Sequence, residues 1–320
     1  MATMTHDRVA AGRLRAGLGF AMLSASSFAM SGPLASGLMD AGWSSAAAVA
    51  VRVLLAGVVL TPIAVVQLRG RWQVLRRTAP LITAYGMLAV AGCQLAFFNA
   101  VAHMEVGVAL LVEYTAPVAV VVWLWLRHGQ RPGRLTVLGA VFGLVGLALV
   151  LDLASGARAD AVGILWALGA MVGAAAYFVL SARDGDGLPG TVLAAGGLLL
   201  GGVALVLAGV VGIVPWVVST GSVAFDGAFG GFTVAWWLPV VALGVVTAAL
   251  AYVAGIAATR RLGSRLASFV ALTEVVAALV FAWLLLGEAP GAIQLVGGAL
   301  IMTGVVAVRL GERPVARSER

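Results

Sequence analysis

Long stretches of uninterrupted apolar residues, separated by short polar connections, dominate the chain. A helix needs about 20 apolar residues to cross the hydrocarbon core of a bilayer. Continuous apolar runs favour such helices over barrel strands, in which apolar and polar residues alternate. The pattern predicts ten transmembrane helices, at residues 16–38, 43–66, 81–103, 107–126, 135–151, 161–181, 191–212, 237–259, 266–286 and 291–308. We expect a loop over Gln67–Pro80 and a longer interfacial loop over Ile213–Trp236.

The composition supports a chain that lies in a membrane. Of its 320 residues, 62% are hydrophobic and 10% are charged, and the mean hydropathy is +1.07. Soluble domains have about 45–50% apolar and about 25% charged residues. A water-soluble enzyme, a disordered protein and a fibrous repeat are therefore excluded, and the sequence predicts an all-α integral membrane protein.

The arginines predict how the chain is oriented. The formal charge is +7, but the basic residues form short clusters between apolar runs and no continuous phosphate-binding face, so no nucleic-acid partner is expected. If the N-terminus is cytoplasmic, 18 arginines fall on the cytoplasmic side and only Arg158 falls outside. Because cytoplasmic loops carry the excess of basic residues, we expect a multi-pass protein of the cell membrane. Its tails, 1–15 and 309–320, are predicted to be cytoplasmic.

The chain contains an internal repeat. A shift of 158 residues aligns several pairs: Gly129 with Gly287, Pro132 with Pro290, Gly139 with Gly297, Gly146 with Gly304, and Thr115 with Thr273. The predicted repeats, 16–151 and 161–308, each hold five spans, and this odd number makes the second repeat enter the membrane the other way up. Many secondary transporters have such inverted repeats, with the substrate site near the midplane between them.

Two motifs carry a resemblance to a known family. The first half contains Glu113-Tyr-Thr-Ala-Pro117 and the second contains Gly287-Glu-Ala-Pro290. Both halves resemble the EamA repeats of the drug/metabolite transporter superfamily, and the first motif is similar to the threonine/homoserine-exporter branch. The chain departs from the family at Gln130, where Glu is frequent, and at Val275, where Pro is frequent. The resemblance implies a secondary transporter, most simply an exporter, of amino acids or related amphipathic metabolites.

Two ionisable residues lie at a similar depth in their spans. Arg52 and Glu113 are each about 12–14 Å from the outer end, at 1.5 Å rise per residue. An Arg52–Glu113 ion pair is therefore possible. The pair either fixes helix packing permanently, or Arg52 binds a substrate carboxylate while Glu113 binds an ammonium group or a proton.

Glu274 approaches the midplane from the opposite side, and the sequence places no cationic residue at its depth. Burial disfavours the ionised form of a carboxyl group, so Glu274 is a candidate proton carrier. A neutral acid that only bonds a neighbouring helix is the alternative. Neutral polar residues complete the predicted substrate site, although each also serves as interhelical packing. The predicted substrate-binding residues are Arg52, Gln94, Asn99, Glu113, Tyr114 and Tyr252.

Other classes of function find less support. Cys93 is the single cysteine and is interpreted as a packing residue; neither a metal site nor a cofactor is predicted. The chain has no nucleotide-binding motif for ATP hydrolysis, and its spans hold no nucleophile–base pair typical of a membrane-embedded enzyme. A channel or a structural membrane subunit remains the alternative to a transporter. The expected partners are a small-molecule substrate and the lipid bilayer, and a homodimer is left open.

Overall fold

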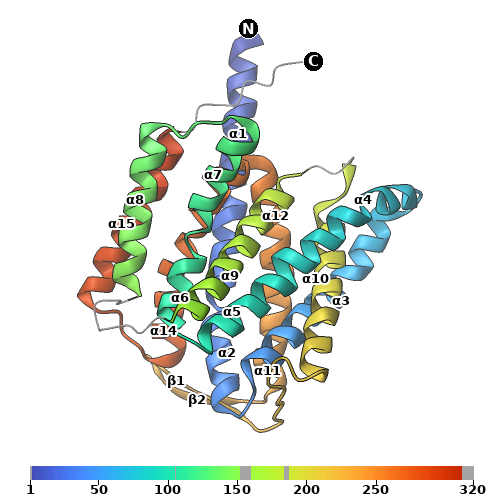
Figure 1. The fold of residues 1–320 in the computed structure, drawn as a ribbon, viewed down its shortest axis with the longest axis vertical. Coiled ribbons are helices and arrows are strands. Elements are labelled where there is room, and N and C mark those ends of the chain that lie inside the picture. The colour runs from blue at the N-terminus through green and yellow to red at the C-terminus, as the bar shows by residue number, and fades with distance from the viewer. Residues whose placement is uncertain (1, 105, 152–159, 184–186, 312–320) are drawn as a thin grey trace.

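The computed structural model describes residues 2–104, 106–151, 160–183 and 187–311. Its helices lie roughly along one direction and form a bundle (Figure 1). Within these ranges, nine helices are long and apolar enough to cross a membrane, and one apolar helix, Arg134–Val150, is shorter. Together they account for the ten predicted spans, and the all-α membrane fold is confirmed.

The first repeat contains five spans, three of which are interrupted. Its elements are α1 (Ala2–Ala29), α2 (Ser31–Asp40), α3 (Ser45–Leu68), α4 (Trp72–Ala84), the π-helical segment η1 (Tyr85–Gly92), α5 (Cys93–Val101), α6 (Val106–Glu113), α7 (Ala116–His128) and α8 (Arg134–Val150). The Ser44 side chain caps α3 by accepting a hydrogen bond from the backbone N–H of Ala47. The span made of α1 and α2 is interrupted at Met30.

The second repeat follows the same plan. Its elements are α9 (Ala161–Ser181), α10 (Gly190–Val210), α11 (Trp237–Gly244), the π-helical segment η4 (Val245–Leu250), α12 (Ala251–Leu262), α13 (Ser264–Ala271), α14 (Thr273–Leu286) and α15 (Ala292–Gly311). A hairpin of β1 (Val223–Gly227) and β2 (Gly230–Val234) stands between α10 and α11. The π-helical segments of the two repeats end at Gly92 and Leu250, which are equivalent under the 158-residue shift.

The bundle has two polar ends, which we call the N-terminal face and the hairpin face. Gly17 of α1 lies against Leu262 at the end of α12. At the same face, the Arg265 guanidinium donates to the carbonyl of Gln130 over 3.3 Å. Gly287 instead lies against the carbonyl of Asp226 in the hairpin. The equivalent loops that follow α7 and α14 are therefore on opposite faces, as an inverted repeat requires.

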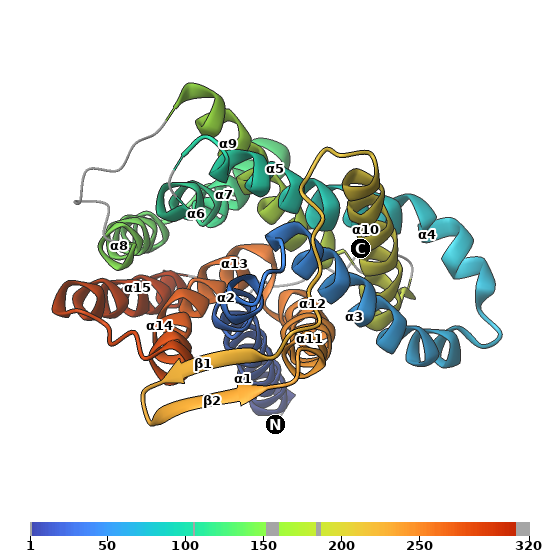
Figure 2. The ribbon, with the colours of Figure 1, turned by 90° about the horizontal axis from the view of Figure 1, so that it is seen from below.

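The last helices of the two repeats, α8 and α15, run side by side (Figures 1 and 2). A Cβ atom added to Gly139 would lie 2.6 Å from the carbonyl oxygen of Gly304, and one added to Gly146 would lie 2.5 Å from that of Gly297. These two contacts exchange under the 158-residue shift, so they are related by the pseudo-twofold axis of the repeats. Small residues allow such close approach where lipid gives no hydrophobic drive for helix association.

Two connections differ from the predicted loops. Helix α4 begins at Trp72, within the predicted loop Gln67–Pro80, and includes Pro80. Its arginines lower the mean hydropathy, so a search for apolar runs misses this amphipathic start. Part of the segment Ile213–Trp236 forms the antiparallel hairpin, which lies beside α2 and α14 (Figure 2). In the hairpin, the buried Phe225 ring packs on Gly37, where a Cβ atom would come within 2.5 Å of it.

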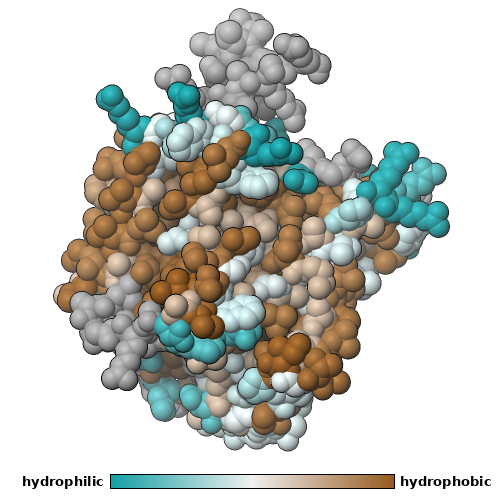
Figure 3. Space-filling model, in the orientation of Figure 1, coloured by the Kyte–Doolittle hydropathy of each residue, from teal (hydrophilic) through white to brown (hydrophobic). Residues whose placement is uncertain are grey.

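The outer surface of the bundle is apolar. In the view of Figure 3, hydrophobic side chains cover the middle of the molecule and hydrophilic ones gather towards its ends. Leu126, Leu165 and Leu207 are 78%, 69% and 57% exposed. Large apolar side chains exposed in this number suit contact with lipid tails rather than with water.

Candidate functional site

A cavity of about 520 Å³ lies between the two repeats. Helices of both repeats line it, from α1 and α3 in the first to α12 and α14 in the second. It brings together most of the polar residues predicted from the sequence: Arg52, Gln94, Glu113, Tyr114, Tyr252 and Glu274. Asn99 is not among the lining residues, and its amide donates to the Leu95 carbonyl one turn earlier, over 2.8 Å.

The fourth span of each repeat is broken where it reaches the cavity. Helix α6 ends at Glu113 and α7 begins at Ala116, whereas α13 ends at Ala271 and α14 begins at Thr273. At both breaks a threonine hydroxyl donates to the carbonyl three residues earlier. Thr115 bonds Val112 over 2.6 Å, and Thr273 bonds Val270 over 2.7 Å. The two hydrogen bonds are equivalent under the 158-residue shift, so both breaks follow from the repeat.

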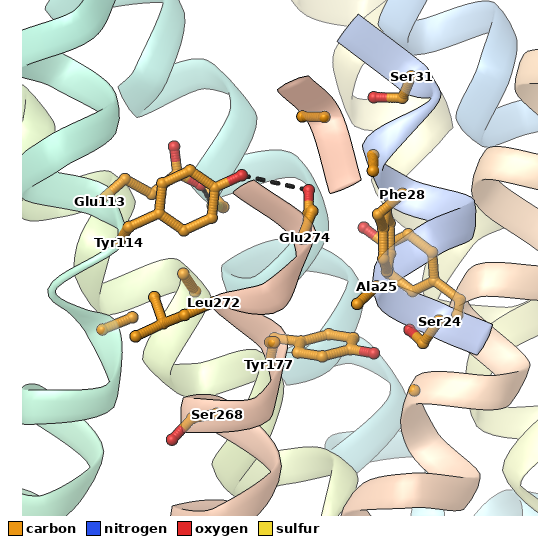
Figure 4. A pocket seen from close by; sticks show the side chains of 18 of the residues that line it. Ser24, Ala25, Phe28, Ser31, Glu113, Tyr114, Tyr177, Ser268, Leu272 and Glu274 are labelled. Atoms are coloured by element: carbon orange, nitrogen blue, oxygen red, sulfur yellow. Dashed lines mark hydrogen bonds between the residues drawn. The ribbon is translucent and has the colours of Figure 1, made fainter. Parts of the chain in front are cut away.

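A hydrogen bond connects the two broken spans across the cavity. The Tyr114 hydroxyl donates to Glu274 Oε1 over 3.2 Å (Figure 4). Tyr114 lies in the break between α6 and α7, and Glu274 is the second residue of α14. The two repeats therefore meet at a carboxyl group that faces the cavity. A movement of one repeat relative to the other changes the distance between Tyr114 and this carboxyl group.

Arg52 holds a buried position on α3. Its side chain is 8% exposed, and Nη1 donates to the Ser31 hydroxyl over 2.8 Å. Ser31 is the first residue of α2, directly after the interruption at Met30. The Arg52 Nε atom has no hydrogen-bond partner among the described residues. A buried guanidinium with an unused donor is suited to bind an anionic group that enters the cavity.

The predicted Arg52–Glu113 ion pair is not formed between these two described residues. Glu113 Oε1 instead accepts a hydrogen bond from Cys93 Sγ over 3.4 Å, so Cys93 does more than pack. Cys93 also fills the space beside Gly173 of α9, as a packing residue would. The error arises because sequence position gives the depth of a residue in the membrane but not the side of the helix from which it projects.

The expectation that Glu274 has no cationic residue near its depth is also wrong. Arg52 and Glu274 line the same cavity. They do not approach to ion-pair distance in the described structure. The cavity therefore presents a guanidinium and a carboxyl group that face a common space without direct contact.

Aromatic residues form the wall opposite Tyr114 and Glu113 (Figure 4). The Tyr252 ring packs edge-on against Phe28 with centroids 5.1 Å apart and against Tyr177 at 5.6 Å. Three further residues that line the cavity were not predicted from the sequence: Ser24, Phe28 and Tyr177. Each lies in an apolar span without a charged neighbour, so nothing in the pattern separates it from a packing residue. Within the described ranges, no three His, Cys, Asp or Glu residues gather as metal ligands.

Comparisons with known proteins agree with this architecture. The EamA-like transporter family matches the chain twice, over residues 15–152 and 161–310. The crystal structure of another protein superposes with a TM-score of 0.72 and 23% sequence identity, over 93% of this chain and 98% of the other. This likeness concerns the fold. No curated protein matches the chain.

Proposed function

Because this chain belongs to the EamA-like transporter family, we propose that it is a secondary transporter that exports small zwitterionic metabolites. Amino acids and related amphipathic compounds are the substrates that fit best. The observation that carries the proposal is the separation of charge in the cavity, with Arg52 and Glu274 facing the same space. A zwitterion has the complementary pair of charges.

Each end of such a substrate finds a partner. The guanidinium of Arg52 offers donors to a carboxylate, and the carboxyl groups of Glu274 and Glu113 accept from an ammonium group. The remaining wall is largely apolar, with alanines and the rings of Phe28, Phe97 and Phe178 available to the substrate side chain. The volume of about 520 Å³ lies in the usual range for small-molecule sites, about 300–1,000 Å³.

Alternating access is the transport mechanism that suits this arrangement. In inverted-repeat transporters, one repeat moves against the other around a fixed midplane site. Here the Tyr114–Glu274 hydrogen bond joins the two repeats at their broken spans. A substrate ammonium that binds Glu274 therefore binds where the repeats meet. It favours the arrangement of the repeats in which Glu274 can contact both the ammonium group and the Tyr114 hydroxyl.

Glu274 is also our candidate for coupling to protons. A carboxyl group can hold either a proton or a substrate ammonium, and burial disfavours the ionised form when neither partner is present. Exchange of one for the other, as the cavity changes sides, couples export to proton entry. Glu113 is the second intramembrane acid on the same cavity.

We infer that the N-terminal face is cytoplasmic and that the protein lies in the cell membrane, because the arginine excess is on this face. Single cysteines placed in the Arg127–Arg134 and Gly287–Pro290 loops, in a Cys93→Ser protein, test this orientation with a membrane-impermeant thiol reagent. We expect labelling of the second loop alone in intact cells. Labelling of the first loop alone would reverse the orientation.

Counterflow in proteoliposomes tests the transport function. A panel should include zwitterionic amino acids, their decarboxylated amines and their N-acetylated forms. We expect exchange of the zwitterions and at least about 30-fold slower exchange of both analogues, since loss of a buried charge partner costs about 2–5 kcal/mol. Equal exchange of all three forms would contradict the proposed site, and ion conductance through single molecules would favour a channel.

Variants locate the effect in the cavity. Arg52→Ala should slow zwitterion exchange by at least about 30-fold, to the rate of the decarboxylated amine. Asn99→Ala, which changes an intramembrane amide that does not line the cavity, should keep the wild-type rate. Both proteins must remain monodisperse after purification. A wild-type rate in a well-folded Arg52→Ala protein would remove Arg52 from the site.

A further inference from the structure

Three buried hydroxyl groups lie in the protein interior next to the cavity, outside the proposed substrate contacts. They belong to Tyr177 and Ser181 on α9 and to Tyr85 on η1, and we call them the hydroxyl seam. Tyr85 and Ser181 are both 0% exposed. None of the three hydroxyl oxygens meets hydrogen-bonding geometry with a partner within the described structure, although the Tyr177 hydroxyl lies close to that of Ser24 beside Gly255. An unpaired buried polar group costs about 1–3 kcal/mol, so three together require an explanation.

Packing alone does not explain the tyrosines. The Tyr85 ring lies against Gly197 of α10, and the Tyr177 hydroxyl lies against Gly255 of α12; at neither glycine is there room for a Cβ atom. Phenylalanine would fill the same spaces between these helices without burying an unpaired hydroxyl. The spaces between the helices fit the two tyrosine rings, but the tyrosine hydroxyl groups make no hydrogen bond with the described residues that would stabilise the fold.

The seam continues from the cavity in unbroken contact. Tyr252 and Tyr177 both line the cavity, and their rings are 5.6 Å apart. The Tyr177 and Tyr85 rings are 5.9 Å apart. The Ser181 hydroxyl, one helical turn beyond Tyr177, lies close to that of Tyr85 although the two do not meet hydrogen-bonding geometry.

The far end of the seam points to the N-terminal face. Arg260 lies in the last turn of α12, and its partner Leu188 packs in the same buried cluster as Tyr85. Arg260 Nη1 donates to the Leu188 carbonyl over 2.7 Å, just before α10 begins. Two residues further, Leu262 lies against Gly17 of α1, at the N-terminal face. The seam therefore spans the part of the protein between the cavity and the side that we propose to be cytoplasmic.

Charged and ionisable groups lie at the two ends of the seam. Glu274 lines the cavity together with Tyr177, whereas Arg260 lies at the far end, in the last turn of α12. An excess proton is disfavoured beside Arg260 and favoured beside a carboxylate. A proton that enters the seam is therefore expected to bind the Glu274 carboxyl rather than remain on one of the hydroxyl groups.

We propose that the hydroxyl seam carries protons between Glu274 and the N-terminal face, by a route separate from that of the substrate. Each hydroxyl oxygen accepts a proton from one neighbour and releases its own to the next, with water bridging where the oxygens are too far apart. Only O–H bonds form and break, and no residue of the seam keeps a charge. The proposal rests on the proposed proton-coupled function of the cavity.

The test separates substrate exchange from proton movement. Proteoliposomes with an entrapped pH dye report counterflow at equal pH, substrate accumulation driven by a pH gradient, and substrate-triggered proton flux. We expect Tyr85→Phe to keep counterflow while accumulation and proton flux fall by about tenfold or more, because proton transfer through positioned groups contributes at least this much. Ser181→Ala should act in the same direction and serves as the second variant if Tyr85→Phe does not fold.

Thr247→Val is the matched control. Its hydroxyl is equally buried, lies on η4 and donates to the Leu243 carbonyl away from the seam. We expect this control to keep both accumulation and proton flux.

Several results would overturn the seam. The first is accumulation in Tyr85→Phe at the wild-type level. The second is a parallel loss of counterflow and proton flux in a monodisperse Tyr85→Phe protein. The third is a wild-type protein whose substrate accumulation does not change with the pH gradient. If the wild-type protein shows counterflow but does not respond to the pH gradient, the seam is wrong and the transport function stands. If the wild-type protein shows no counterflow, the proposed transport function is wrong. If it also shows no proton flux under a pH gradient, the seam is wrong as well.

Discussion

The two broken spans, α6/α7 and α13/α14, share a backbone and differ in chemistry. Both break at the same place in the 158-residue register, and both secure the break with a threonine hydroxyl. The acids, however, are not equivalent. The counterpart of Glu113 is Ala271, and the counterpart of Glu274 is Ala116. Duplication thus explains the symmetric scaffold, whereas each repeat has its own acid at a different position beside the break.

The same contrast holds for Tyr114. Its counterpart in the second repeat is Leu272, which lines the cavity but has no hydroxyl. The hydrogen bond between the repeats therefore has no symmetric copy. We infer that symmetry positions the hinge points and that asymmetry sets the direction and selectivity of transport.

The largest effect should come from a comparison of the two acids. Glu274→Gln keeps the shape of the side chain but can neither pair with an ammonium group as an anion nor release a proton. We therefore expect slower substrate exchange and no accumulation driven by a pH gradient. The Glu113 carboxyl contacts Cys93 rather than Tyr114, so Glu113→Gln should weaken binding of the substrate ammonium but keep a response to the pH gradient. Transport assays in proteoliposomes distinguish the two. If Glu274→Gln accumulates substrate as well as wild type, Glu274 is not the proton carrier and Glu113 becomes the acid to test.

The symmetry of α8 and α15 predicts a matched pair of effects on stability. Gly139→Ala and Gly297→Ala each place a Cβ atom against a backbone carbonyl of the partner helix, 2.6 Å and 2.5 Å away. We expect each to lower the free energy of unfolding by about 1–3 kcal/mol, as overpacking does. Thermal unfolding in detergent measures the effect.

Gly19→Ala on α1 is the control, because nothing lies within 4 Å of its added Cβ atom. It should be neutral or mildly stabilising, since Ala favours a helix over Gly. Unequal losses at Gly139 and Gly297 would show that the two helices are not equivalent in the folded protein.

The smallest predicted effect concerns Tyr114. Tyr114→Phe keeps the ring and removes the hydrogen bond to Glu274, which contributes about 1–2 kcal/mol. We expect a severalfold change in exchange rate without loss of expression, measured by counterflow. Leu272 is the counterpart of Tyr114 in the second repeat. Leu272→Met conserves its apolar character and should change the exchange rate less. A Tyr114→Phe protein that matches wild type would make the connection between the repeats dispensable.

Sequence alone predicted much of the scaffold, and the reason is physical. Crossing a bilayer demands long apolar helices, and duplication leaves glycines in register, so the spans and the inverted repeat are both visible in the residue pattern. The amphipathic start of α4 and the β-hairpin were not predicted from the sequence, because neither is a long apolar run.

The site was predicted less completely. Intramembrane charge identified Arg52, Glu113 and Glu274, which the structure brings to one cavity. Their partners were not predictable, because contacts depend on how each helix is rotated. Arg52 meets Ser31 at the α1/α2 interruption, and no feature of the sequence marks that serine. Tyr177 escaped for the same reason, since its role depends on neighbours from η1 and α12.

The central claim is that Arg52 binds the carboxylate of a zwitterionic substrate inside the cavity. The most direct measurement compares counterflow of an amino acid with that of its decarboxylated amine, in wild type and in Arg52→Ala. The account predicts a preference of at least about 30-fold for the amino acid in wild type. The preference should fall to near unity in the variant, because neither compound then contacts the Arg52 guanidinium. An unchanged preference in a folded, active Arg52→Ala protein would contradict it.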